Sequence, residues 1–118
     1  MRAIDAVGDY GERLAERYLV GQGLTVLERR WRCRLGEIDI VAVDGGCLVV
    51  CEVKTRRSLL AGAPLEAVTP AKLARLRRLA AAWLEQQPLR FAEVRIDVVG
   101  VVVPRSGRAR LEHLRGVA

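Results

Sequence analysis

The segment from Gly36 to Lys54 constrains the fold of this chain more than any other stretch. Two apolar, strand-like runs flank the pair Gly45-Gly46 within it. Two glycines between such runs are typical of a two-residue β-hairpin, because its tight turn requires positive φ angles that glycine adopts at little cost. The turn would pair Asp44 with Cys47 and so set the register of both strands.

Four polar side chains are predicted to meet at the end of this hairpin that lies away from the turn. The register places Asp39 opposite Glu52, and Glu37 opposite Lys54. Side chains of directly paired residues, and of residues two apart on one strand, project from the same face of a sheet. The hairpin therefore predicts one polar patch made of these four residues.

The rest of the chain shows helical and strand-like patterns in turn. Apolar residues recur at three- and four-residue steps in two segments, which predicts two amphipathic helices. Thr69-Pro70 marks the start of the second, as an N-cap followed by proline. This helix is expected to bury Leu73, Leu76, Ala80, Trp83 and Leu84.

Both hairpin strands are apolar on both faces, as expected at the centre of a sheet that helices cover. The sequence therefore predicts an α/β fold with a mixed central sheet flanked by helices. The predicted elements are a helix over 5–22, strands over 24–31, 37–43 and 47–55, a helix over 70–87 and a strand over 93–103.

Length and composition fit a single domain over residues 1–118, since 51% of the 118 residues are hydrophobic. A basic tail from about residue 105 to 118 is expected to be less ordered, although Leu111 and Leu114 could dock. The net charge of +6 suggests an anionic partner: nucleic acid first, a membrane surface second, and solubility alone third. No run approaches the ~18 apolar residues that span a bilayer, and no signal peptide is expected.

The three cysteines, Cys33, Cys47 and Cys51, contain no CxxC pair. Cys47 and Cys51 lie four apart in a predicted strand, so they are interpreted as small buried apolar residues rather than as metal ligands. An odd number of cysteines fits a reducing compartment. We therefore expect a cytoplasmic protein that is not bound to a membrane.

Two carboxylates beside a lysine suit metal-assisted hydrolysis of phosphodiester bonds. Mg²⁺ prefers oxygen ligands, usually one or two carboxylates together with water and substrate phosphate. Mg²⁺, or Mn²⁺ in its place, lowers the pKa of a bound water, and a lysine can orient that water. The alternative is a cross-strand salt bridge from Glu37 to Lys54. Crowded carboxylates beside an apolar sheet favour a cation, because unpaired acids repel one another and are costly to bury.

Asp39, followed after twelve residues by Glu52-Val53-Lys54, resembles the PD-(D/E)XK motif of restriction-endonuclease-like nucleases, with Ile38 in place of the motif's proline. Beyond this motif, the sequence is similar to the YraN-like family of small bacterial proteins over nearly the whole chain. The similarity implies an αβββαβ core, shared with archaeal Holliday junction resolvases. It rests on Gly11-Glu12, Gly36-Glu37-Ile38-Asp39, Glu52-Val53-Lys54-Thr55-Arg56, Arg95-Ile96-Asp97-Val98-Val99 and His113-Leu114-Arg115.

The resemblance implies a role for each acid and for the lysine. Asp39 and Glu52 correspond to metal ligands, and Lys54 corresponds to the catalytic lysine. Glu12 corresponds to a helix acid found beside the metal in many relatives; a solvated charge is the alternative. Glu37 is expected to be a partner of Lys54, or an acid in the outer shell of the metal.

Basic residues surround the predicted patch. Arg56 and Arg57 directly follow the second hairpin strand, and Lys72 and Arg75 lie in the second helix. Such cations would hold a DNA backbone near the scissile bond, whereas a solvated face is the alternative for each group. Aromatic residues make up only 4% of the chain, so backbone or branched shape is expected to be recognised rather than base sequence. A symmetric homodimer would suit the cutting of two strands.

Three functions remain open at this point. The first is a Mg²⁺-dependent endonuclease or junction-resolving nuclease. The second is a nuclease-fold module that binds nucleic acid or a recombination partner without cutting, and the third is a scaffold whose charges serve solubility. The complete set of Asp39, Glu52 and Lys54 favours the first, because a binding module has no need to keep all three together.

Overall fold

The computed structural model describes residues 6–60 and 62–117. The predicted order of elements is confirmed from the first helix to the fourth strand; a short 3-10 helix and a fifth strand were not predicted. The elements are α1 (Ala6–Gly21), β1 (Thr25–Cys33), β2 (Gly36–Asp44), β3 (Cys47–Arg56), the 3-10 helix η1 (Pro64–Ala67), α2 (Pro70–Glu85), β4 (Glu93–Val102) and β5 (Arg110–Leu114).

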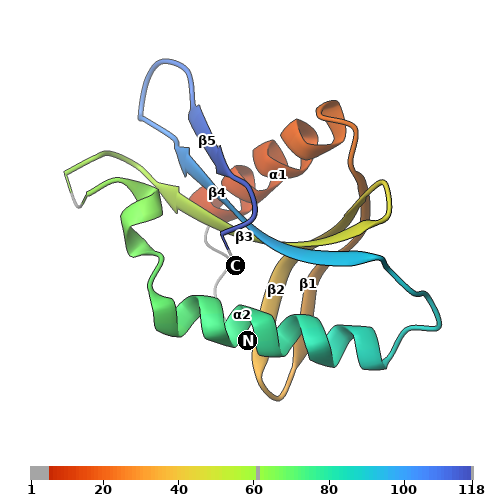
Figure 1. Cartoon of the computed structure of the whole chain (residues 1–118). Helices are drawn as coiled ribbons and strands as arrows, with labels where there is room; N and C mark the ends of the chain where they lie inside the picture. The colour runs from red at the N-terminus through yellow and green to blue at the C-terminus, as the bar shows by residue number, and fades with distance from the viewer. Residues whose placement is uncertain (1–5, 61, 118) are drawn as a thin grey trace.

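One five-stranded sheet lies between the two α-helices (Figure 1). Its strands follow the order β1-β2-β3-β4-β5; β3 and β4 are parallel, and all other neighbours are antiparallel. Parallel neighbours need a crossover connection, which η1 and α2 supply. The predicted α/β fold with a mixed sheet is therefore confirmed, and β3 is its central strand.

The apolar residues of the hairpin divide between two clusters, one under each helix. Ile40 and Val49 pack with α1, and Ile38 and Val50 pack with α2. Cys51 is fully buried on the α1 side, and burial raises the pKa of its thiol well above the ordinary value. The interpretation of Cys51 as a buried apolar residue is confirmed.

The start of α2 follows from its first residues. The Thr69 hydroxyl accepts a hydrogen bond from the backbone N–H of Lys72 at 3.2 Å, and Pro70 occupies the first helical position, as predicted. Of the predicted buried stripe, three residues are buried and two are partly buried. Leu79, which was not predicted, is fully buried with them.

The hairpin register agrees with the prediction. Gly45 has a φ of 61°, and the pairs run from Asp44–Cys47 to Ile40–Cys51. The positive φ explains why the turn needs glycine. The register therefore brings the polar end of β2 beside the polar end of β3.

The basic tail is more regular than the sequence suggested. Residues Arg110–Leu114 form β5, which pairs antiparallel with β4 from Val102 back to Val98. Leu111 packs against the α1-side cluster, whereas Leu114 is exposed. The expectation of a less ordered tail is wrong for this segment, because the edge of β4 was available for pairing. In the described part of the chain, no helix combines the length and the apolarity that a membrane span requires.

Candidate active site

The polar end of the β2–β3 hairpin forms a cleft with a volume of about 420 Å³. The structure brings together there the four polar residues that the register groups, and Arg75 of α2 joins them. The lining residues are Gly36, Glu37, Asp39, Glu52, Val53, Lys54 and Arg75. Carboxylates and cations from three elements thus converge on one site.

The regular alternation of side chains between the two faces of β2 is interrupted at Asp39. Ile38 packs on the α2 side of the sheet, whereas Ile40 packs on the α1 side, although residues two apart on a regular strand share a face. In β1, Arg30 lies across from Asp39 in the register and has a φ of 53°, a left-handed conformation that is uncommon for a residue with a side chain. Both strands are therefore irregular at the level of Asp39.

This irregularity ends the β2–β3 ladder and turns the Asp39 side chain toward β3. The last ladder pair is Ile40–Cys51. Beyond it, Asp39 Oδ2 accepts a hydrogen bond from the backbone N–H of Val53 at 2.8 Å. The predicted pairs Asp39–Glu52 and Glu37–Lys54 are therefore not part of the ladder. The Asp39 side chain takes the Val53 N–H, which a backbone carbonyl of β2 would otherwise accept.

Asp39 lies where ionisation is costly. Burial is the main cause that raises its pKa from 3.8 to about 7, and the charges of Glu52, Glu12 and Glu37 raise it further. The hydrogen bond from Val53 acts in the opposite direction. A carboxyl group shifted by burial and by neighbouring acids is a candidate functional group, and a cation in the cleft would relieve the repulsion.

The carboxylate oxygens in the cleft are suitable ligands for a hydrated Mg²⁺. Asp39 and Glu52 both contribute to the lining, and Mg²⁺ is commonly held by one or two carboxylates, with water and substrate phosphate completing its shell. Within residues 6–60 and 62–117, no three His, Cys, Asp or Glu side chains are grouped so as to hold a metal ion. The residues present therefore fit an open site shared with substrate rather than a closed protein cage.

Arginines of β1 hold the other two acids that the sequence singled out. Glu12 accepts a hydrogen bond from Arg30 Nε at 3.1 Å and does not line the cleft. Glu37 lines the cleft, but its Oε2 lies 2.6 Å from Arg32 Nε. No ion pair joins Glu37 to Lys54 within the described residues, because the β1–β2 register places Arg32 directly opposite Glu37.

Cations gather beside the carboxylates. Lys54 lies close to Lys72 in the first turn of α2, and the charge of Lys54 is the main cause that lowers the pKa of Lys72. The Nε atom of Arg56 is buried and has no hydrogen-bond partner among the described residues. Clustered cations beside a helix N-terminus favour an anion. Arg57 does not line this cleft; it lies in a separate groove.

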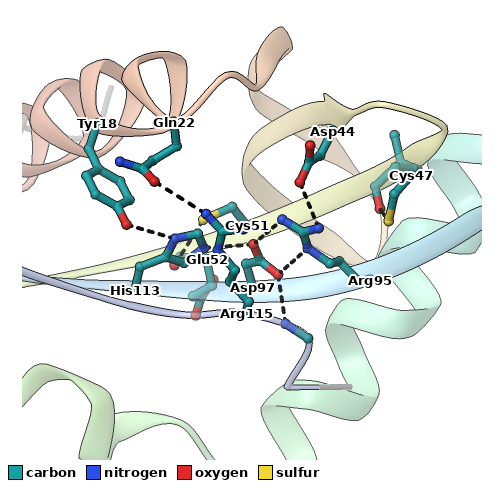
Figure 2. Close-up of polar contacts among 12 residues, drawn as sticks. Tyr18, Gln22, Asp44, Cys47, Cys51, Glu52, Arg95, Asp97, His113 and Arg115 are labelled. Atoms are coloured by element: carbon teal, nitrogen blue, oxygen red, sulfur yellow. Dashed lines mark hydrogen bonds and ion pairs between the residues drawn. The ribbon is translucent and has the colours of Figure 1, made fainter.

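A buried polar network around Asp97 was not predicted as a functional or structural unit (Figure 2). The Asp97 side chain is fully buried, and it accepts hydrogen bonds from Arg95 Nε at 3.0 Å and from the Gly116 N–H at 2.9 Å. His113 Nε2 lies 2.7 Å from Asp97 Oδ2, and His113 Nδ1 lies 3.2 Å from the Tyr18 hydroxyl. The network joins β4, β5 and α1 outside the cleft. An aspartate inside an apolar strand is the sequence signal that could have identified it.

Comparisons with known proteins cover almost the whole chain. The family model described as "Uncharacterised protein family UPF0102" matches residues 11–101, a range that contains every residue lining the cleft. The chain is similar to a UPF0102 protein of Kineococcus radiotolerans, with 62% identity over 100% of this chain and 98% of the relative. It is also similar to those of Beutenbergia cavernae (62% identity, 99% of each chain) and Streptomyces coelicolor (58% identity, 100% of this chain and 92% of the relative).

Proposed function

The chain belongs to the UPF0102 family, and from this premise and the cleft we propose that it is a metal-dependent endonuclease that hydrolyses phosphodiester bonds in DNA. One observation carries the proposal. Asp39, Glu52 and Lys54 share a cleft at the end of two neighbouring strands. This is the combination of side chains that the PD-(D/E)XK resemblance of the sequence requires.

Asp39 and Glu52 would hold Mg²⁺ or Mn²⁺. When bound, the ion supplies charge neutralisation at the phosphate and a lower pKa for an attacking water. The Val53 N–H orients the Asp39 carboxylate from behind. Lys54 follows Glu52 by two residues on the same strand, so it can orient the water and stabilise the negative charge that develops on the phosphate.

The DNA backbone would be held by the cations beside the cleft. Arg75 lines the cleft, and Lys72 lies next to Lys54. Arg56, which the sequence also proposed as a backbone contact, ends the same strand as Lys54, but its buried Nε faces away from solvent and is not counted among these contacts. Contacts of this kind position a phosphate without reading base sequence. We therefore propose substrates defined by shape, with branched or junction DNA among them.

The test is a cleavage assay with the purified full chain on single-stranded, duplex and branched DNA. Mg²⁺ and Mn²⁺ are each compared with EDTA. We expect metal-dependent cleavage of at least one DNA form, and its loss in Asp39→Asn and in Lys54→Ala. Glu85→Gln is the matched control, because Glu85 is an exposed acid at the end of α2, outside the cleft.

Failure to cut any DNA form with either ion would overturn the nuclease proposal. If the chain then still bound DNA, and Asp39→Asn bound it equally well, the result would favour a nucleic-acid-binding module on a nuclease fold. The cluster of Lys54, Lys72 and Arg75 would serve such a module without the carboxylates. Because cleavage and binding are measured separately, the two functions are distinguishable.

A further inference from the structure

A second groove lies at the carboxyl ends of the two parallel strands. It separates residues 57–60, which follow β3, from the connection between β4 and β5, and its volume is about 640 Å³. The pair Arg56–Val102 ends the β3–β4 ladder, so both segments leave the sheet at the same end (Figure 1). The proposed chemistry in the first cleft makes no use of this groove.

The groove combines positive charge with exposed apolar surface. Arg57, Arg108 and Arg110 line it, and none of the acidic residues that the structure describes does. None of the three arginines forms an ion pair within the described residues. Three guanidinium groups without an ion pair favour the binding of an anion such as phosphate, because each guanidinium can donate two hydrogen bonds to it.

The apolar part of the groove is unusual for a surface loop. Leu59 is 57% exposed and Leu60 is 97% exposed, and both line the groove together with Pro104. Neighbouring exposed leucines contribute nothing to the core, and a grouped apolar surface in a concave site marks a place where a partner binds. The partner must therefore carry both negative charge and apolar faces.

We propose that this groove binds an unpaired DNA strand, with the arginines on its phosphates and the leucines against its bases. An unpaired strand exposes both phosphates and flat apolar base faces, whereas a duplex hides the base faces within its stack. Arg57 lines the groove, and the residue before it, Arg56, ends β3, the strand that carries Glu52 and Lys54 of the first cleft. One strand can therefore pass from the groove to the cleft.

This inference deepens the proposed function and rests on it in one respect: the DNA bound in the groove is a substrate only if the first cleft cleaves DNA. With the cleft on duplex and the groove on an unpaired strand, the preferred DNA is one in which a single strand leaves a duplex. The binding step itself does not depend on cleavage, since the groove shares no residue with the carboxylate cleft.

Fluorescence anisotropy of the full chain in EDTA tests the groove. The probes are a labelled oligo(dT) strand and a blunt duplex with the same number of phosphates. We expect tighter binding of the single strand. Leu59→Ser/Leu60→Ser should weaken single-strand binding about tenfold and leave duplex binding unchanged, because only unpaired bases meet the leucines. Both leucines are exposed, so the fold should persist; circular dichroism verifies it.

Neutralising the groove tests its cations separately. Arg108→Ala/Arg110→Ala should reduce the slope of log affinity against log salt on the single strand by about 1.4, since each phosphate contact contributes about 0.7. Arg90→Ala is the matched control, an exposed arginine between α2 and β4 at the other end of the sheet. Equal affinity for both probes, an unchanged single-strand affinity in the leucine variant, or no DNA binding would each overturn the inference. If the chain cleaves DNA but the groove variants change neither single-strand affinity nor its salt dependence, the inference about the groove is overturned and the nuclease proposal stands.

Discussion

Asp39 and Val53 are joined across the end of the central hairpin, where the Asp39 Oδ2 atom accepts the Val53 N–H at 2.8 Å. Glu52 and Lys54 flank Val53 in β3, so the bond holds the Asp39 carboxylate beside both of them. The contact exists because β2 turns over at this residue and stops pairing with β3 at Ile40. An interruption of the sheet therefore builds the cleft.

The first prediction concerns the dependence of stability on pH. Asp39 has a pKa of about 7 in the folded chain and an ordinary value of 3.8, so between these values the folded state binds a proton that the unfolded state has released. Stability must then fall as the pH rises from about 4 to about 7. Asp39→Asn removes this loss and keeps an oxygen that can accept the Val53 N–H.

We therefore expect Asp39→Asn to be more stable than the wild type at about pH 8 by up to about 4 kcal/mol, and nearly equal to it at about pH 4. Urea denaturation in EDTA at the two pH values measures this difference, with Glu85→Gln as the control. A variant that loses stability at both pH values would show that the Asp39 carboxylate is not under strain in the cleft.

The second prediction concerns the contact between α1 and β3. A Cβ atom at Gly11 would overlap the Thr55 Oγ1 atom and lie 2.7 Å from Thr55 Cγ2, so the helix can approach the strand only with glycine at this position. Alanine normally favours a helix, but here we expect Gly11→Ala to reduce the free energy of unfolding by about 2 kcal/mol through overpacking.

Gly21→Ala is the matched control, since a Cβ atom at Gly21, also in α1, meets nothing within 4 Å. We expect it to keep or slightly raise the stability, by less than about 1 kcal/mol. Chemical denaturation of both variants measures the contrast. Equal behaviour of the two variants would contradict the close approach of α1 to Thr55.

The third prediction concerns Asp97. Asp97→Ala would leave the donors of Arg95, His113 and Gly116 unsatisfied in a buried site, so we expect a loss of about 3 kcal/mol in the free energy of unfolding. Asp44→Ala is the control: it also removes a carboxylate bound to Arg95, but Asp44 is 37% exposed and should cost less than about 1 kcal/mol. Hydrogen exchange should become faster in β5 for the first variant alone. Similar losses for both variants would show that the network is not what holds β5 in place.

Local sequence signals predicted the parts of the fold that depend on neighbouring residues. Gly45-Gly46 fixed the hairpin register because a primed turn admits few other residues, and Thr69-Pro70 located the start of α2. The grouping of Asp39, Glu52 and Lys54 followed from that register.

The features that sequence reasoning missed depend on contacts between distant segments. The turn-over of β2 at Asp39 accompanies the left-handed conformation of Arg30 in another strand, which no local pattern signals. Glu37 pairs with Arg32 of β1 rather than with Lys54 of β3. The sequence predicted only the β2–β3 register, so it could not identify this partner on the other side of β2. The β5 strand is joined to β4 by pairing and by the contact between Asp97 and His113, sixteen residues apart, which no local periodicity signals.

Anomalous diffraction from crystals of the full chain soaked in Mn²⁺ tests the proposed metal site without reference to any substrate, because it locates the ion itself. A metal site at Asp39 and Glu52 should give an anomalous peak within bonding distance of carboxylate oxygens of both residues, and this peak should disappear in Asp39→Asn crystals. A cleft with no anomalous peak at saturating Mn²⁺, or a peak bound only elsewhere on the molecule, would contradict it.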